Sequence, residues 1–149
     1  MNTESQAFPT IAKLLGYGGV IPFVALAIGI AAGIDLEALG IKQAGFKLLG
    51  YGAVIISFIG AVHWGIAMQS PGSRQNALFV YSVMPALFAW VWLFFDVKAA
   101  LFGMGLTIVA MFFIDRWLLS ALVSRGYLKM RLRLTFIVAA CLFLAAIFV

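Results

Sequence analysis

Cysteine, histidine and acidic residues are scarce in this chain, whose 149 residues include one cysteine, one histidine and five aspartates or glutamates. The lone Cys141 excludes an intrachain disulfide and a cysteine metal cluster within one chain. The lone His63 means that bis-histidine haem ligation would need a dimer. Nucleotide loops of the GxxxxGKS or GxxxxGKT type and nucleophile elbows are also missing. We therefore predict no metal and no cofactor, and these absences disfavour an enzyme.

Charge is scarce as well: charged residues make up 10% of the chain and hydrophobic residues 65%, with a mean hydropathy of +1.13. Soluble domains carry about 25% charged and about 45–50% apolar residues. We therefore expect the lipid bilayer as the main partner and no nucleic acid. At about 20 residues per crossing, the length permits five or six crossings in one transmembrane domain over 1–149. Residues 1–10 are polar and lack a positive n-region, so we expect no cleaved leader.

Five long apolar runs follow one another, separated by short polar links. Their continuous apolar character predicts helices, because barrel strands alternate in polarity and an open sheet leaves backbone groups unpaired in lipid. Each run is long enough to cross the roughly 30 Å hydrocarbon core as a helix. We predict an all-α membrane protein, a bundle of five transmembrane helices with spans at about 11–33, 47–69, 77–95, 99–121 and 132–149.

Lysine and arginine are divided unevenly between the two sides of such a bundle, six against three. The richer side holds the N-terminus and the second and fourth links, so the positive-inside rule places the N-terminus in the cytoplasm and the C-terminus in the periplasm. We infer a multi-pass protein of a bacterial inner membrane. The cations around the start of the last span are expected to meet anionic lipid headgroups on the cytoplasmic side: Arg125, Lys129, Arg131 and Arg133.

The first two runs open with nearly the same nine residues, KLLGYGGVI at 13–21 and KLLGYGAVI at 47–55. Because the two spans cross in opposite directions, the copies are inverted, and Tyr17 and Tyr51 are expected at opposite interfaces. Inverted repeats occur in secondary transporters, where the site lies between the halves. Since the similarity covers only a short stretch, we favour an anchoring and packing repeat over a transport-type pseudo-twofold axis.

Small residues and prolines indicate how the helices touch. Gly29 and Gly33 form a GxxxG pattern in the first run, and Gly60 lies on a stripe of small residues in the second, so close helix contacts are expected at both. Pro22 and Pro85 each remove a backbone donor inside a span and should kink its helix. We interpret both kinks as packing features.

Ionisable residues inside spans are candidates for function, and this chain has three of them, His63, Asp115 and Arg116. His63 and Asp115 each lie about six residues, or about 9 Å, from the inner end of their spans. A polar layer is therefore predicted in the cytoplasmic third, with Asp115 either accepting a hydrogen bond from His63 or pairing with Arg116. Further members expected at a similar level are Ser82, Thr135 and Tyr17.

The polar layer has two main interpretations. As a structural network it would satisfy buried polar groups and fix the helix register. As a proton-linked or ligand site it would use His63 as the group that titrates near neutral pH, with Asp115 orienting it. A group of aromatic residues is interpreted as interfacial belt and packing rather than as a quinone pocket: Phe88, Trp90, Trp92, Phe94 and Phe95, with Trp64 and Trp117.

Four strings carry a family resemblance: LLGYGGVIPF at 14–23, YGAVIISFIGAVHWG at 51–65, SVMPALFAW at 82–90 and RLRLT at 131–135. Together they resemble the transmembrane protein 69-like family of small bacterial and mitochondrial inner-membrane proteins, a domain of unknown function. The resemblance implies an inner-membrane helical bundle in which His63, Trp64 and Pro85 are motif positions. It implies no activity.

From the sequence we predict a non-catalytic integral membrane protein that serves as an accessory or assembly component of a larger membrane complex. The alternative is a small proton-linked or ligand-binding transporter or channel that acts as an oligomer through a His63/Asp115 layer, because five helices rarely enclose a pathway alone. The two hypotheses predict different partners. An accessory protein binds another membrane protein, whereas a small transporter binds further copies of itself.

Overall fold

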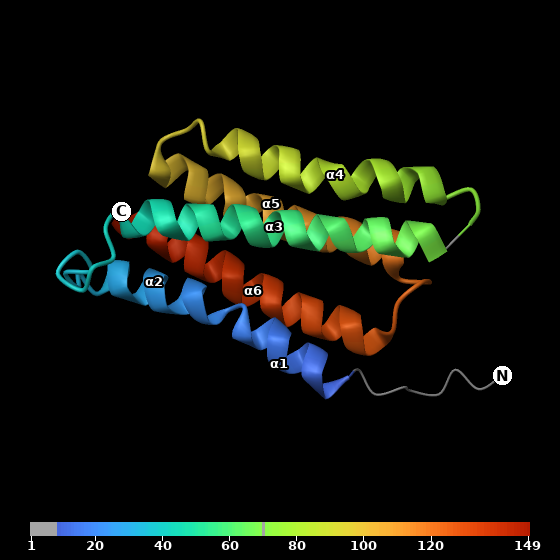
Figure 1. The fold of residues 1–149 in the computed structure, drawn as a ribbon, viewed down its shortest axis with the longest axis horizontal. Helices are drawn as coiled ribbons and strands as arrows, with labels where there is room; N and C mark the ends of the chain where they lie inside the picture. The colour runs from blue at the N-terminus through green and yellow to red at the C-terminus, as the bar shows by residue number, and fades with distance from the viewer. Residues whose placement is uncertain (1–8, 70) are drawn as a thin grey trace.

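Every regular element in the part of the chain that the structure describes, residues 9–69 and 71–149 of a computed structural model, is a helix (Figure 1). The expectation about a leader at residues 1–10 falls almost wholly outside this part. The helices are α1 Thr10–Gly18, α2 Ile21–Ala31, α3 Ala44–Gln69, α4 Gln75–Trp92, α5 Val97–Leu119 and α6 Arg125–Phe148. Four stretches are long and apolar enough to cross a membrane: Thr10–Ala31, Ala44–Gln69, Val97–Leu119 and Arg125–Phe148. The chain is an all-α membrane protein.

Helix α4 is the weakest candidate for a membrane crossing. It has 18 residues, opens with the amides Gln75 and Asn76, and is not one of the four long apolar stretches. Figure 1 nevertheless shows α4 alongside α3 over most of its length, and α4 also packs on α5. The helix expected at 77–95 is therefore present between Gln75 and Trp92, whereas its crossing of the membrane stays a prediction.

The first apolar stretch forms two helices rather than one. Helix α1 ends at Gly18 and α2 begins at Ile21, with Pro22 in the first turn of α2, where a missing N–H breaks no helical hydrogen bond. The hydroxyl of Tyr51 on α3 donates a hydrogen bond to the carbonyl of Gly19 at this break, over 2.9 Å. Tyr51 is thus tied to the break in the first stretch, and its position at a membrane interface stays a prediction.

The two ends of the bundle differ in charge. The basic end, as we call it, holds the starts of α1, α4 and α6 and the last turns of α3 and α5 (Figure 1). Among the residues that the structure describes, seven cations lie on or beside these helix ends, against the single acid Asp115: Lys13, Arg74, Arg116, Arg125, Lys129, Arg131 and Arg133. At the opposite end three lysines meet three acids: Lys42, Lys47, Lys98, Asp35, Glu37 and Asp96. Among the described residues the net charge is therefore +6 (seven minus one) at the basic end and zero at the other.

Glycines permit the closest contacts, although not all of those predicted. A Cβ at Gly60 would lie 2.7 Å from a backbone carbonyl oxygen of α4 and 3.2 Å from Pro85, so α3 and α4 meet there almost backbone to backbone. Gly29 instead packs under the side chain of Leu36 in the following link. Gly33 has a φ of +64° and open space around it, as expected for a glycine just past a helix end. The GxxxG pattern is therefore a helix terminus and not a helix–helix contact.

Helix α5 lies at the centre of the core and carries more buried residues than any other helix of the described chain. A Cβ at Gly103 would lie 2.5 Å from the ring of Trp92, whose Nε1–H donates a hydrogen bond to the Thr107 hydroxyl over 3.0 Å. A Cβ at Gly105 would lie equally close, 2.5 Å, to the ring of Phe143 on α6. The rings of Trp92 and Phe143 thus fill the space that side chains at Gly103 and Gly105 would occupy, and they pack α4 and α6 against α5.

Candidate functional site

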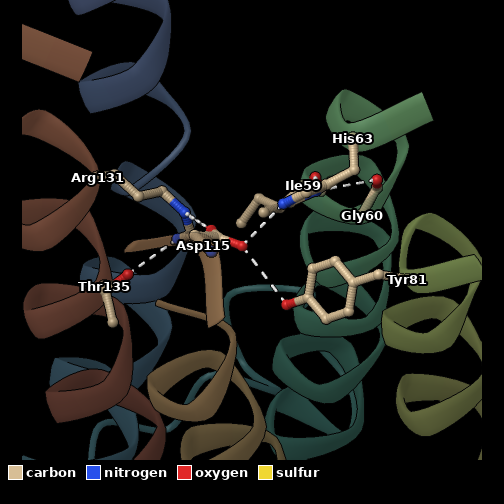
Figure 2. A network of polar contacts seen from close by, with 7 residues as sticks. All are labelled: Ile59, Gly60, His63, Tyr81, Asp115, Arg131 and Thr135. Carbon is tan, nitrogen blue, oxygen red and sulfur yellow. Dashed lines mark hydrogen bonds and ion pairs between the residues drawn. The ribbon is translucent and has the colours of Figure 1, made fainter. Parts of the chain in front are cut away.

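Asp115 on α5 is the centre of a buried polar network at the basic end (Figure 2). Its Oδ2 accepts a hydrogen bond from Arg131 Nε over 2.9 Å, and its Oδ1 lies 3.0 Å from His63 Nε2. The Tyr81 hydroxyl donates a longer hydrogen bond to Oδ1, over 3.4 Å. The carboxylate therefore joins its own helix to α3, α4 and α6, one side chain from each.

Arg131 on α6 is held from two sides although it is a cation in a membrane helix. Its Nε–H is bonded to Asp115, and its Nη1–H donates a hydrogen bond over 2.9 Å to the hydroxyl of Thr135, one turn further along α6. Only 4% of Arg131 is exposed, and its Nη2 has no hydrogen-bond partner among the described residues. The charge of the guanidinium is thus paired with that of Asp115, but not all of its N–H groups donate a hydrogen bond to the described residues.

His63 on α3 is fully buried and faces acceptors with both ring nitrogens. Its Nδ1 lies 3.3 Å from the backbone carbonyls of both Ile59 and Gly60, so Nδ1 carries a proton if it bonds to them. On the other side Nε2 faces the Asp115 carboxylate, but its N–H is not aligned with an acceptor. The Tyr81 ring packs edge-on against the imidazole, with centroids 4.7 Å apart. Only the doubly protonated ring could donate in both directions.

The residues predicted for the polar layer are only partly together. His63 and Asp115 are in contact, as described above. Ser82 is buried on α4, but its hydroxyl donates to the carbonyl of Phe79 over 2.6 Å, a bond within its own helix. Arg116 is exposed on the far side of α5 and does not pair with Asp115 in the part of the chain that the structure describes, because successive helical residues point about 100° apart. Tyr17 is 39% exposed on α1 and lies outside this network.

Arg131 corrects a second prediction. It was expected at the lipid headgroups with Arg125, Lys129 and Arg133, which are exposed, whereas Arg131 is buried against Asp115. The three exposed residues recur every four positions and share one helical face, while Arg131 lies two positions from its nearest member and points inward. This spacing, and the four-residue interval from Arg131 to Thr135, were the signals available in the sequence.

The arrangement can hold four helices in register, since each bond crosses between elements in a setting of low dielectric. The ionisable groups of the network are too deeply buried to contact a bulky substrate in this conformation, since His63 and Asp115 are 0% exposed. Within residues 9–69 and 71–149, no group of three or more His, Cys, Asp and Glu side chains is placed to hold a metal ion. Proton exchange between His63 and Asp115 is the chemistry that the network itself could support.

Comparison with known proteins agrees with the sequence resemblance. Over 89 residues the chain is 35% identical to transmembrane protein 69 of Xenopus tropicalis. This match covers 58% of the chain and 34% of that protein, so the chain spans about a third of the length of this curated relative. No solved structure matches the chain. A family model described as a protein of unknown function, DUF3429, matches residues 8–147, and the chain therefore belongs to that family.

Proposed function

We propose that the chain is a non-catalytic integral membrane protein that serves as an accessory or assembly component of a larger membrane complex. The observation that carries this proposal is that the polar network is buried inside the helix bundle. His63 and Asp115 are 0% exposed and Arg131 is 4% exposed, and the side chains of His63 and Arg131 both face the Asp115 carboxylate inside the bundle. A catalyst or carrier needs a polar group that reaches its substrate, whereas an assembly component needs only a rigid body and a surface.

The proposed placement in the membrane follows the charge of the bundle. We propose five crossings, with α4 as the fifth, because α4 lies beside α3 and its 18 residues span about 27 Å. The net charge of +6 at the basic end, against zero opposite, supports a cytoplasmic N-terminus and a periplasmic C-terminus in a bacterial inner membrane. Arg125, Lys129 and Arg133 then meet the anionic lipids of the cytoplasmic leaflet.

Reporter fusions test this placement. A reporter inserted at residue 128, in the segment that carries Arg125 and Lys129, is expected to signal from the cytoplasm. A reporter after Val149 is expected to signal from the periplasm. Signals from the same side would show that the number of crossings between these two points is even, and five crossings would then be wrong.

The accessory role is tested by isolating the chain from native membranes in mild detergent. We expect another membrane protein to remain bound in a fixed ratio and to be lost when the detergent is exchanged for a harsh one. A second preparation carries Arg74→Gln, an exposed cation in the link before α4, as a control for non-specific charge effects. Isolation of the chain alone, or only with copies of itself, would contradict the proposal.

A proton-linked transporter is the second candidate, and one observation favours it. Nε2 of His63 lies 3.0 Å from the Asp115 carboxylate without an aligned N–H, and Arg131 Nη2 has no hydrogen-bond partner within residues 9–69 and 71–149, so the network could rearrange when a proton moves. Proton flux into liposomes that contain the purified chain distinguishes the two functions. A flux that His63→Ala abolishes without lowering the melting temperature would favour the transporter. No flux, with loss of stability in His63→Ala and Asp115→Asn, would favour the accessory role.

A further inference from the structure

An open groove of about 420 Å³ lies between α1 and α6 at the basic end, away from the buried network. Its lining is formed by one residue of α1 and four of α6: Tyr17, Leu132, Arg133, Phe136 and Ile137. The surface of the groove is wholly apolar, so Tyr17 contributes its ring and Arg133 its alkyl stem to the lining. The side chain of Phe136 is 75% exposed and that of Leu132 49%, so no other part of the described chain covers the groove.

The groove exists because α1 touches α6 along one edge only. A Cβ at Gly16 would lie 3.3 Å from Leu134 and 3.5 Å from Met130, which places the close contact on that face of α6. The four lining residues of α6 are on the neighbouring face, beside this contact. The break between α1 and α2 lets α1 take its own direction over the start of α6 (Figure 1). The space beside the contact is therefore left open toward the lipid.

Exposed cations lie beside the apolar groove at the basic end. Arg133 lines the groove with its alkyl stem, because no polar atom contributes to the lining surface. Lys129 lies one turn before Arg133 on the same face of α6, Lys13 lies one turn before Tyr17 on α1, and all three cations are exposed. Asp115, the one acid among the described residues at this end, is buried and paired with Arg131, so it does not neutralise them. Eight residues, or about 12 Å along the helix, separate Lys129 from the apolar lining at residue 137.

A phospholipid has the same arrangement, with a charged headgroup followed by apolar acyl chains. We propose that the groove binds an anionic phospholipid, with one acyl chain on Phe136 and Ile137 and the phosphate between Arg133, Lys129 and Lys13. The cations lie at the basic end, toward the starts of α1 and α6, where we propose that headgroups lie, and the apolar lining lies deeper, where acyl chains lie. The site goes beyond the proposed function, since an accessory protein and a transporter could each carry it.

The test measures lipid retention by the full chain purified in detergent, using native mass spectrometry and lipid titration. Phosphatidylglycerol is compared with phosphatidylcholine of identical acyl chains and with glycerol phosphate, which carries the headgroup charge without a chain. We expect one phosphatidylglycerol molecule to be retained per chain, weaker retention of phosphatidylcholine, and no binding of glycerol phosphate. Equal retention of the two lipids, or binding of glycerol phosphate alone, would overturn the proposal.

Variants locate the site. Arg133→Gln is expected to weaken phosphatidylglycerol binding about five-fold, the effect of one cation near a lipid surface, and Arg133→Lys to retain most of it. Ile137→Trp should fill the groove and also reduce retention. The matched control is Arg74→Gln, which removes an exposed cation at the same end outside the groove and should leave binding unchanged. Equal effects of Arg133→Gln and Arg74→Gln, in variants with unchanged melting temperature, would show general charge attraction and no site.

Discussion

The buried pair of Asp115 and Arg131 allows the sharpest test of the structural interpretation. Arg131→Met leaves a carboxylate in the core without its main counter-charge, and Asp115→Leu leaves the guanidinium in the same position. Breaking a buried ion pair from one side costs about 3–5 kcal/mol. At about 2–4 °C per kcal/mol for a chain of this size, each single change should lower the melting temperature by roughly 6–20 °C.

The double variant should lose much less stability than the sum of the losses in the two single variants. With both charges removed, apolar side chains of similar volume fill the site and no unpaired charge is left, which is often close to neutral. We therefore expect a coupling free energy of at least about 2 kcal/mol between Asp115 and Arg131. Unfolding in mixed micelles with increasing dodecyl sulfate, followed by tryptophan fluorescence and circular dichroism, gives the four stabilities of the cycle.

Arg116→Met is the matched control, because Arg116 is the same residue type beside Asp115 but exposed. It should change stability by no more than about 0.5 kcal/mol, as surface substitutions do. The reasoning would be refuted if the two changes at Asp115 and Arg131 added within about 0.5 kcal/mol. It would also be refuted if Arg116→Met were as damaging as Arg131→Met.

Three further predictions concern the packing of the bundle. Gly60→Leu should lower stability by about 1–3 kcal/mol or more, because even a Cβ there would lie 2.7 Å from a carbonyl oxygen of α4. Gly103→Ala should destabilise the chain and shift its tryptophan emission, because the new methyl group would meet the Trp92 ring at 2.5 Å. Tyr51→Phe should cost about 1 kcal/mol, because it removes the hydrogen bond to the carbonyl at the break between α1 and α2. All three are measured as unfolding free energies in the same micelles.

Their controls come from the same helices. Gly65 on α3 has open space around it, so Gly65→Leu should be much milder than Gly60→Leu. Equal losses at the two glycines would mean that the backbone of α3 does not meet α4 at Gly60. Stability unchanged by Gly103→Ala would place Trp92 elsewhere. An effect of Tyr51→Phe within error would show that water or lipid replaces the hydroxyl at the break.

The helical class was predictable because apolar runs of this length leave the backbone no other way to satisfy its hydrogen bonds in lipid. The proximity of His63 and Asp115 was predicted from their equal depth, since the rise of a helix is fixed at about 1.5 Å per residue. The same argument placed Ser82 and Tyr17 at this level, but depth does not decide direction. Ser82 bonds to its own helix, and Tyr17 lies on the separate α1.

The role of Arg131 was missed because cations near a helix end were assigned together to the headgroups. Which of them turns inward depends on the angle around the helix, and that angle has meaning only when the neighbouring helix is known. Gly29 was misassigned for a related reason. A GxxxG pattern near the end of a run marks a close helix contact only if the helix continues, and here Gly33 ends it with a positive φ.

The measurement that most directly tests the central claim is the mass of the intact particle isolated from native membranes, compared with multiples of the 16.1 kDa chain. An accessory or assembly component predicts a particle that contains the chain and at least one different protein in a fixed ratio. The same particle is expected from the Asp115→Leu/Arg131→Met double variant once it is folded. In the accessory role, the polar network stabilises the helix bundle and takes no part in binding the other protein. A particle whose mass is an integer multiple of the chain, with proton flux in liposomes, would contradict the account.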